Sequence, residues 1–301
     1  MLSLALLLPG GASASSHIQY GVQDDAWLLY GPEPPAQRIE ILQRLGVDIV
    51  RLTLRWDTVA KSAPADARNP SDPAYDWDLY DPLLQRLRAA RALLDAYAQN
   101  PYPVRPGETP SSGGCWHCTE ITMATLPKLI TEVKRDFGTR TRIWLTEYGY
   151  NSKPPSKWLG VSNALQARYV GEAALRAYLA PRVDLLIHFL VRDEPNAFKW
   201  TSGFYTSRGK AKPSFNAYAL PFAQVARKGN RTTVWGQVRP RAGAQPYGLQ
   251  QYRSGRWSWL GGTRLTTRAG YLRRVITAGR GVRLRLWSPR DRRYSAVVTV
   301  R

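Results

Sequence analysis

In the stretch Ile143-Trp-Leu-Thr-Glu147-Tyr-Gly149-Tyr150, a largely apolar run is followed by the carboxylate of Glu147. The run predicts a β-strand over residues 142–148, and Gly149 lets the chain turn sharply behind the acid. A helical pattern follows over 161–179, and a nearly continuous apolar strand over 183–191. Uninterrupted apolar strands are typical of parallel sheets covered on both faces, so this part of the chain predicts an α/β fold.

Strands and helices alternate in the same way towards the N-terminus. The segment 17–28 is predicted as a strand that leads into a loop. Further strands are predicted at residues 48–56 and 93–102, and helices at 35–45, 78–91 and 121–137. The first helix has its apolar residues at helical spacing and ends at Gly46. Folds of this kind carry their functional residues on loops at the carboxyl ends of strands, which is where Glu147 stands.

The pattern changes after residue 223. Short alternating runs, separated by Gly and Arg about every 8 to 12 residues, predict a small antiparallel β-sandwich over residues 224–301. The polar stretch Lys228-Gly-Asn-Arg231 is the predicted joint. Alternating strands bury one face, so we expect the Trp residues of this part to fill its core. These are Trp235, Trp257, Trp259 and Trp287.

The positive charge of the chain is concentrated in the same C-terminal part. The chain carries 43 Lys and Arg against 22 Asp and Glu, and residues 224–301 hold 18 of the bases with a single acid, Asp291. A net charge of +17 over this part indicates attraction to a polyanion, such as an anionic cell-wall polymer. No recognised nucleic-acid module accompanies the charge, which argues against nucleic acid as the partner.

The N-terminus predicts export. An apolar run from Leu2 to Leu8 precedes turn-forming residues and the Ala12-Ser-Ala14 site, the pattern of a signal peptide whose remnant is residues 1–14. The run is too short to span a bilayer, and no later stretch reaches about 18 uninterrupted apolar residues, so no membrane span is expected. We therefore expect a secreted protein, with cell-wall association as one outcome.

Both cysteines lie in one motif, Cys115-Trp-His-Cys118, after a Gly-rich loop. The spacing allows a redox dithiol, half of a zinc site or a local disulfide. A redox motif opens a helix after a strand, and a zinc site needs a second ligand pair, neither of which the sequence shows. In an exported chain the spacing favours a disulfide. We predict no metal and no other cofactor.

Several segments together resemble the clan A glycoside hydrolases, the cellulase-like (β/α)8 barrels. Thr146-Glu-Tyr-Gly149 is similar to the end of their seventh strand, Val47 to Trp56 to their second, and Leu190 to Ala219 to their eighth strand and final helix. The resemblance implies Glu147 as the nucleophile that attacks the anomeric carbon and Arg51 as its hydrogen-bond partner. It implies sugar contacts from these residues: Trp56, Tyr102, Tyr148, Asp193, Glu194 and Trp200.

A retaining glycosidase needs one ionised and one protonated carboxyl group about 5 to 5.5 Å apart, and an Arg beside Glu147 would keep that carboxylate charged. The family's acid/base Glu stands in an Asn-Glu-Pro motif before the nucleophile, yet this sequence has no Asn-Glu dipeptide. The chain between the second and sixth strands is also too short for three strand-helix units of about 30 residues each. The resemblance thus implies a barrel that lacks strands three to five, with the acid/base unassigned.

The sequence therefore predicts a TIM-barrel-like glycosidase domain over residues 15–223 and a basic β-sandwich over 224–301. Its expected substrate is a polysaccharide, hydrolysed at O-glycosidic bonds with retention. Two alternatives stay open at this point. One is a carbohydrate- or cell-wall-binding protein without turnover, and the other is a structural or adhesive protein that uses the cationic C-terminal part.

Overall fold

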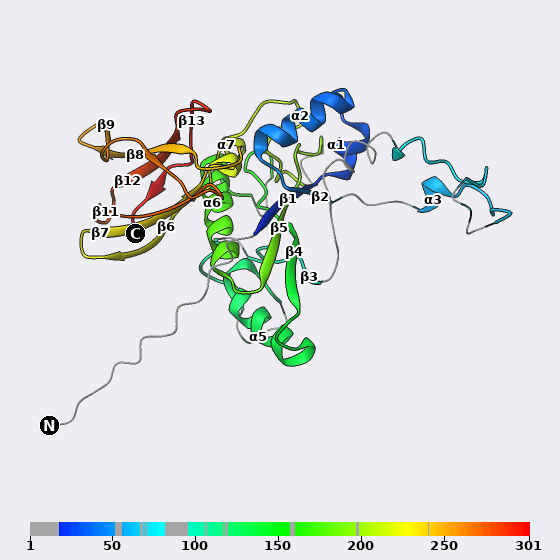
Figure 1. Cartoon of the computed structure of the whole chain (residues 1–301), viewed down its shortest axis with the longest axis horizontal. Coiled ribbons are helices and arrows are strands. Elements are labelled where there is room, and N and C mark those ends of the chain that lie inside the picture. The colour runs from blue at the N-terminus through cyan, green and yellow to red at the C-terminus, as the bar shows by residue number, and fades with distance from the viewer. Residues whose placement is uncertain are drawn as a thin grey trace.

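The computed structural model describes residues 18–51, 56–66, 69, 71–81, 96–105, 107–115, 117, 120–156, 160–196, 199–239 and 241–301. The predicted signal segment over residues 1–14 lies outside these residues, as does most of the predicted helix at 78–91. The described chain contains a parallel sheet with helices and two antiparallel sheets (Figure 1). The predicted α/β class is confirmed at this level.

The parallel sheet has five strands in the order β2-β1-β5-β4-β3, and every neighbouring pair is parallel. Its strands are β1 (Gln19–Gln23), β2 (Ile49–Arg51), β3 (Ala96–Gln99), β4 (Arg142–Tyr148) and β5 (Val183–Phe189). The predicted strand at 142–148 coincides with β4. In register, Val22 of β1 faces His188 of β5. Because all five strands run the same way, their carboxyl ends meet at one edge.

Helices join and cover these strands. They are α1 (Asp25–Tyr30), α2 (Pro35–Leu45), α3 (Trp56–Val59), α5 (Leu126–Phe137), α6 (Asn163–Leu179) and α7 (Pro213–Ala219), with the 3-10 helix η1 (Met123–Thr125) before α5. Helix α2 opens on Pro35 and ends at Gly46, which adopts φ +71° and the left-handed conformation that glycine favours. The Ser162 hydroxyl caps α6 by accepting a hydrogen bond from the Leu165 N–H at 3.2 Å.

The strand predicted in the segment 17–28 is β1. It ends at Gln23, because Asp24 accepts a hydrogen bond from the Trp27 N–H and begins α1. The strand predicted at 48–56 contains β2; residues 52–55 lie outside the described residues, and α3 begins at Trp56.

The two faces of the parallel sheet differ in burial. On β4, Ile143 and Leu145 are buried in the main core, whereas Trp144 and Thr146 are half-buried on the opposite face. Helices α6 and α7 pack against one another, and α6 also contacts β5. The helix-covered face is therefore the packed one, and the other face is more open in the part of the chain that the structure describes.

The C-terminal part forms two antiparallel sheets. The first contains β6 (Phe222–Lys228), β7 (Arg231–Gln237) and β11 (Tyr271–Thr277). The second contains β8 (Pro246–Arg253), β9 (Arg256–Trp259), β10 (Arg264–Leu265), β12 (Arg283–Ser288), β13 (Arg293–Tyr294) and β14 (Val298–Thr299). One buried cluster includes Phe222 and Val234 of the first sheet with Leu249 and Leu286 of the second. The antiparallel strands agree with the sequence pattern, and the full sandwich architecture stays a prediction.

The domain limits also stay a prediction, but the joint has a different structure from the one expected. Strand β6 runs across the position between residues 223 and 224, and Lys228-Gly-Asn-Arg231 forms the turn between β6 and β7. The polar residues and Gly229, with φ +56°, therefore serve a hairpin.

The C-terminal sheets share a core with the parallel sheet. Trp235 of β7 is 1% exposed and packs against Tyr178 of α6, with ring centroids 5.2 Å apart. Arg239, just after β7, places its guanidinium 3.5 Å from the centroid of the Tyr20 ring in β1. Figure 1 shows α6 between the parallel sheet and strands β6 and β7. The two parts are thus joined by buried side chains.

Candidate active site at the carboxyl edge of the parallel sheet

Glu147 and Arg51 meet at the carboxyl edge of the sheet, as the sequence predicted. Glu147 is the penultimate residue of β4, and Arg51 ends β2 three strands away. Arg51 Nη1 donates to Glu147 Oε1 at 2.7 Å and to Gln23 Oε1 at 2.7 Å. The side chains of Arg51 and Glu147 are 40% and 21% exposed. The ion pair therefore fixes a carboxylate that solvent, and hence a ligand, can reach.

Tyr102 holds the second oxygen of the same carboxylate. Its hydroxyl donates to Glu147 Oε2 at 3.3 Å. Burial, and then the neighbouring Glu147 carboxylate, raise the pKa of Tyr102 well above its usual value. Tyr102 consequently stays protonated and keeps its role as a donor. Arg51 and Tyr102 hold the two oxygens of Glu147 from separate segments of the chain.

Aromatic rings stand beside this carboxylate. The Tyr102 and Trp200 rings are 4.9 Å apart at an interplanar angle of 35°, and Phe189 at the end of β5 meets Trp200 edge to face at 5.3 Å. Trp200 is 37% exposed. Exposed aromatic faces next to a polar group are suited to stacking on the apolar face of a sugar ring.

Asp193 and Glu194 differ in their surroundings. Asp193 is 5% exposed and forms a buried ion pair with Lys212, at 2.8 Å and 3.0 Å from Nζ to the two carboxylate oxygens. Its Oδ1 also accepts from the Gly203 N–H at 2.9 Å. Glu194 accepts a hydrogen bond from the backbone N–H of Trp200 at 2.8 Å and so fixes the chain at that residue. Asp193 is thus placed in the interior, away from the exposed sugar contact expected of it.

The other predicted residues are not brought to the same place. Tyr148 is 3% exposed and packs edge to face against Tyr150 inside the core. A register irregularity between Leu145 and Tyr148 shifts the alternation of β4, so Tyr148 lies on the buried side and Glu147 does not. The side chain of Trp56 lies outside the described residues.

The cysteine motif is described only in part. Cys115 is disulfide-bonded, whereas Cys118 lies outside the described residues. The pairing between the two therefore stays a prediction. Within the described residues no group of three His, Cys, Asp or Glu side chains is arranged to hold a metal ion.

Three further residues at the strand ends escaped the sequence analysis. Gln23 ends β1 and accepts from Arg51, and Asn100 follows β3 and accepts from the Thr146 hydroxyl at 2.8 Å. Asp24 is buried beside them and accepts from the N–H groups of Val191 and Arg192 at 3.0 Å each. Burial raises the pKa of Asp24 to about 6, and these backbone hydrogen bonds offset part of that effect. A systematic list of polar residues at strand ends would have found all three.

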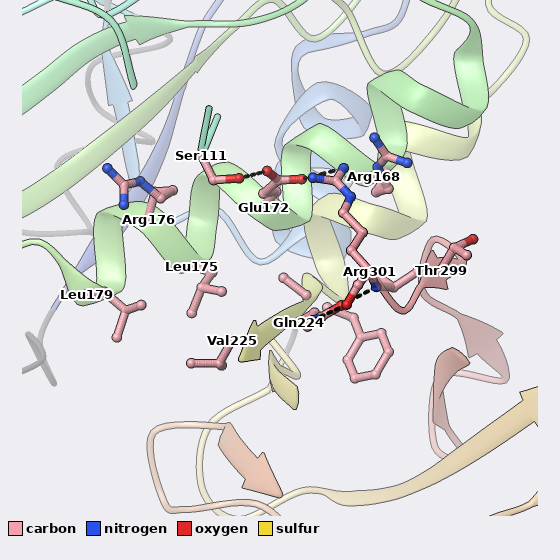
Figure 2. A pocket seen from close by; sticks show the side chains of 13 residues that line it. Ser111, Arg168, Glu172, Leu175, Arg176, Leu179, Gln224, Val225, Thr299 and Arg301 are labelled. Atoms are coloured by element: carbon pink, nitrogen blue, oxygen red, sulfur yellow. Dashed lines mark hydrogen bonds and ion pairs between the residues drawn. The ribbon is translucent and has the colours of Figure 1, made fainter. Parts of the chain in front are cut away.

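A cavity lies between α6, β6 and the end of the chain at Arg301 (Figure 2). Glu172 accepts a hydrogen bond from the Ser111 hydroxyl and pairs with Arg301 at 3.8 Å. Gln224 in turn accepts from the Arg301 N–H at 2.9 Å. These contacts join a loop, a helix and the last residue, which is a structural arrangement and lies away from Glu147.

Every described helix is too short or too polar to cross a bilayer.

Comparisons with known proteins give only distant similarities. No family model and no curated protein matches the chain. Among solved structures, a family 39 glycoside hydrolase from Bacteroides cellulosilyticus is 15% identical, with 80% of this chain and 59% of that chain covered and a TM-score of 0.37. The catalytic domain of a GH30 xylanase C from Talaromyces cellulolyticus is 10% identical, with 95% and 98% covered and a TM-score of 0.41.

A calcium-binding mutant of Bacteroides uniformis β-glucuronidase 2 is 12% identical, with 95% of this chain covered and a TM-score of 0.40. The chain spans 45% of the length of that protein and 59% of the family 39 enzyme. These neighbours are glycoside hydrolases. At such TM-scores and identities, however, they carry no argument about this chain, and its function is inferred from the geometry of the site.

Proposed function

We propose that the chain is a glycoside hydrolase-like protein that acts on O-glycosidic bonds of polysaccharide by a retaining mechanism, with Glu147 as the nucleophile. The observation that carries the proposal is the pair of bonds to Glu147, from Arg51 at 2.7 Å and Tyr102 at 3.3 Å. They orient an accessible carboxylate beside the aromatic rings of Tyr102 and Trp200. Orientation by two donors prepares a carboxylate for attack on a carbon bound in a fixed position.

The chemistry assigned to Glu147 is a displacement at the anomeric carbon. A carboxylate oxygen forms a bond to that carbon while the glycosidic C–O bond breaks and its electron pair leaves with the aglycone oxygen. Water then attacks the anomeric carbon and the bond from that carbon to Glu147 breaks, which restores the carboxylate and releases the sugar with its configuration retained, while the proton of the water passes through solvent to the aglycone anion. Without a second carboxyl group to protonate it, the aglycone must leave as an anion. The reaction is then fastest with aglycones of low pKa.

The strand order supports an incomplete barrel as part of this proposal. In a closed (β/α)8 barrel, strand one lies between strands two and eight, followed by seven and six. The order β2-β1-β5-β4-β3 is the same sequence of neighbours with strands three to five left out. The more open face of β4, with Trp144 and Thr146, is the face that would line the barrel interior.

The test is covalent trapping with 2-deoxy-2-fluoro glycosides that carry a dinitrophenolate leaving group, in the β-glucosyl, β-xylosyl and β-glucuronyl series. Such a leaving group departs without protonation, so the experiment isolates the nucleophile. We expect one dinitrophenolate released per chain and a glycosyl adduct on the peptide that contains Glu147. Glu147→Gln should give no adduct, because the amide lacks the attacking charge.

Glu132→Gln is a matched control, since Glu132 lies on α5 and contacts Lys128. It should be labelled at the parent rate. Labelling of Glu147→Gln at the parent rate, or an adduct on another residue, would overturn the assignment.

The second candidate is a carbohydrate-binding protein without turnover. One observation favours it: the sequence has no Asn-Glu dipeptide, so the usual acid/base motif is missing. If this candidate is right, isothermal titration calorimetry should show binding of β-linked oligosaccharides, Trp200→Ala should lose that binding, and none of the trapping reagents should give an adduct.

We extend the main proposal to secretion and to cell-wall association, on the basis of the N-terminal pattern and the cationic C-terminal part.

A further inference from the structure

The outward side of strand β12 carries large and charged side chains in alternation with buried ones. Leu284 and Leu286 are 1% and 0% exposed and belong to the C-terminal core. Arg283, Arg285 and Trp287 therefore project to the opposite side of the sheet. Across the ladder, Arg283 faces Tyr252 and Arg285 faces Gln250 of β8.

The neighbouring strands continue the same surface. Trp257 of β9 faces Tyr252, Trp259 faces Gln250, and Tyr294 of β13 faces Trp287. We name this surface the outer face, and it consists of Gln250, Tyr252, Trp257, Trp259, Arg283, Arg285, Trp287 and Tyr294. Sequence reasoning placed four Trp residues in the core, which is correct for Trp235 but wrong for Trp257, Trp259 and Trp287 of the outer face. Trp259 is 53% exposed, because it lies on the face of the sheet opposite to the buried face.

Aromatic rings fix the two arginines of the outer face. The Arg285 guanidinium lies 4.0 Å from the Trp257 centroid and 3.7 Å from the Tyr294 centroid, and its Nε donates to Gln250 Oε1 at 2.8 Å. Arg283 lies 3.8 Å from the Tyr252 centroid. Stacking of this kind occupies the faces of a guanidinium and leaves its N–H edge free to donate.

The outer face has no negative charge to balance these arginines. In the described part of the chain, neither Arg283 nor Arg285 has an ion-pair partner. The single acid of residues 224–301 is Asp291, whose side chain is 7% exposed and is bonded by Arg241 and by the Ser288 hydroxyl. A rigid pair of unpaired guanidinium edges is a recognition site for carboxylates, which they can bind through two parallel hydrogen bonds.

We propose that the outer face binds an acidic polysaccharide, with uronate carboxylates on the edges of Arg283 and Arg285 and a pyranose ring stacked on the exposed ring of Trp259. The ring of Trp259 lies against Gly248, where a Cβ atom would be only 2.7 Å from the ring. The absence of a side chain at Gly248 therefore lets the Trp259 ring lie close to the sheet. Single-stranded nucleic acid needs open ring faces for successive bases. Here guanidinium groups already cover a face of Tyr252, Trp257 and Tyr294.

The choice of a sugar polymer rests on the proposed function, whereas the charge complementarity stands by itself. The test uses the full chain and measures binding of polygalacturonate, its methyl ester and a 20-mer of deoxythymidine by biolayer interferometry. We expect binding of polygalacturonate that is at least tenfold tighter than that of the uncharged ester. Binding should weaken as salt rises, because the Debye length falls to about 8 Å at physiological ionic strength.

The decisive variant is the double change Arg283→Gln with Arg285→Gln, which should weaken polygalacturonate binding at least tenfold. The matched control is Arg273→Gln with Arg280→Gln, which removes the same charge from exposed positions outside the outer face. It should change binding less than twofold. Far-ultraviolet circular dichroism and melting curves verify folding, and Trp259→Ala provides a second, uncharged change that should also weaken binding.

Equal loss in both double variants would mean that net charge alone binds the polymer, and it would overturn the proposal. Tighter binding of the oligonucleotide than of polygalacturonate, or burial of the outer face in a self-associated dimer by analytical ultracentrifugation, would also overturn it. The outer-face variants leave Glu147 and its donors Arg51 and Tyr102 in place, and the binding measurement does not depend on turnover. Failure of the trapping experiment therefore remains distinguishable from failure here.

Discussion

At the scale of single residues, Arg51 provides the sharpest test of the proposed site. Arg51→Ala removes the charged donor to Glu147 and to Gln23. We expect the rate of trapping at Glu147 to fall about 100-fold, which is typical for a lost charge-stabilising donor. The free energy of unfolding should change by less than about 1 kcal/mol, because this ion pair is partly exposed.

The control for Arg51→Ala stands on the strand that carries Glu147. Arg142 begins β4 and pairs with Asp184 at the opposite edge of the sheet. Arg142→Ala should leave the trapping rate within about twofold of the parent, as expected for a change remote from the site. Equal rates in the two variants would show that Arg51 has no part in positioning Glu147.

His188 predicts how stability depends on pH. Burial lowers the pKa of His188 to about 4, and its Nε2 bonds the Ser202 carbonyl at 2.9 Å. A carbonyl only accepts, so Nε2 carries the proton and the ring is neutral. The unfolded chain takes up a proton near pH 6.5, so the folded state loses stability as pH falls from about 7 to 4, by as much as about 3 kcal/mol.

Urea unfolding of the parent and of His188→Gln measures this effect. As pH falls from about 7 to 4, the free energy of unfolding should decrease more in the parent than in His188→Gln, because Gln does not titrate. His117→Gln changes an exposed loop residue and should follow the parent at every pH. A parallel pH profile for the parent and His188→Gln would contradict the prediction.

At the scale of elements, the end of α2 is fixed by Gly46. A Cβ at Gly46 would lie 2.6 Å from Arg239 Cβ, and the residue has φ +71°. Gly46→Ala therefore combines backbone strain with a clash, and we expect it to lower the free energy of unfolding by about 2–4 kcal/mol.

Gly229, in the turn between β6 and β7, also has a positive φ of +56° and has nothing within 4 Å of its Cβ position. Gly229→Ala should cost only the backbone strain, about 1–2 kcal/mol. The difference between the two variants in urea unfolding measures the contact between α2 and Arg239. Equal losses in the free energy of unfolding would mean that the chain around Arg239 moves aside without cost.

At the scale of the whole molecule, Trp235 joins the antiparallel sheets to α6. We expect Trp235→Ala to lower the free energy of unfolding by about 3–5 kcal/mol, since a buried ring is replaced by a cavity. The loss should reach both parts together. Hydrogen exchange of amides in α6 and in β8 should accelerate to a similar degree.

Trp259→Ala, at a site that is 53% exposed, is the comparison and should cost no more than about 0.5 kcal/mol. Unchanged protection of α6 in Trp235→Ala would indicate that the two parts unfold independently, as a division into separable domains would require.

The sequence by itself determined the elements whose patterns are local. Strand β4 follows from the apolar run before Glu147, and the end of α2 follows from Gly46, since both depend on residues close in the chain. The contact between Arg51 and Glu147 was expected from the resemblance to the clan A glycoside hydrolases, and the structure has these two side chains bonded.

Only the tertiary structure decided which side of each element is covered. Strict alternation would place Glu147 with the buried Ile143 and Leu145, but a register irregularity between Leu145 and Tyr148 puts Tyr148 on the buried side instead. Asp193 reads as a strand-end acid in the sequence, and Lys212, nineteen residues away, makes it an interior ion pair. Trp235 and Trp259 have similar local patterns, yet one fills the core and the other faces solvent. Burial depends on contacts between segments distant in the sequence, and a local pattern does not contain them.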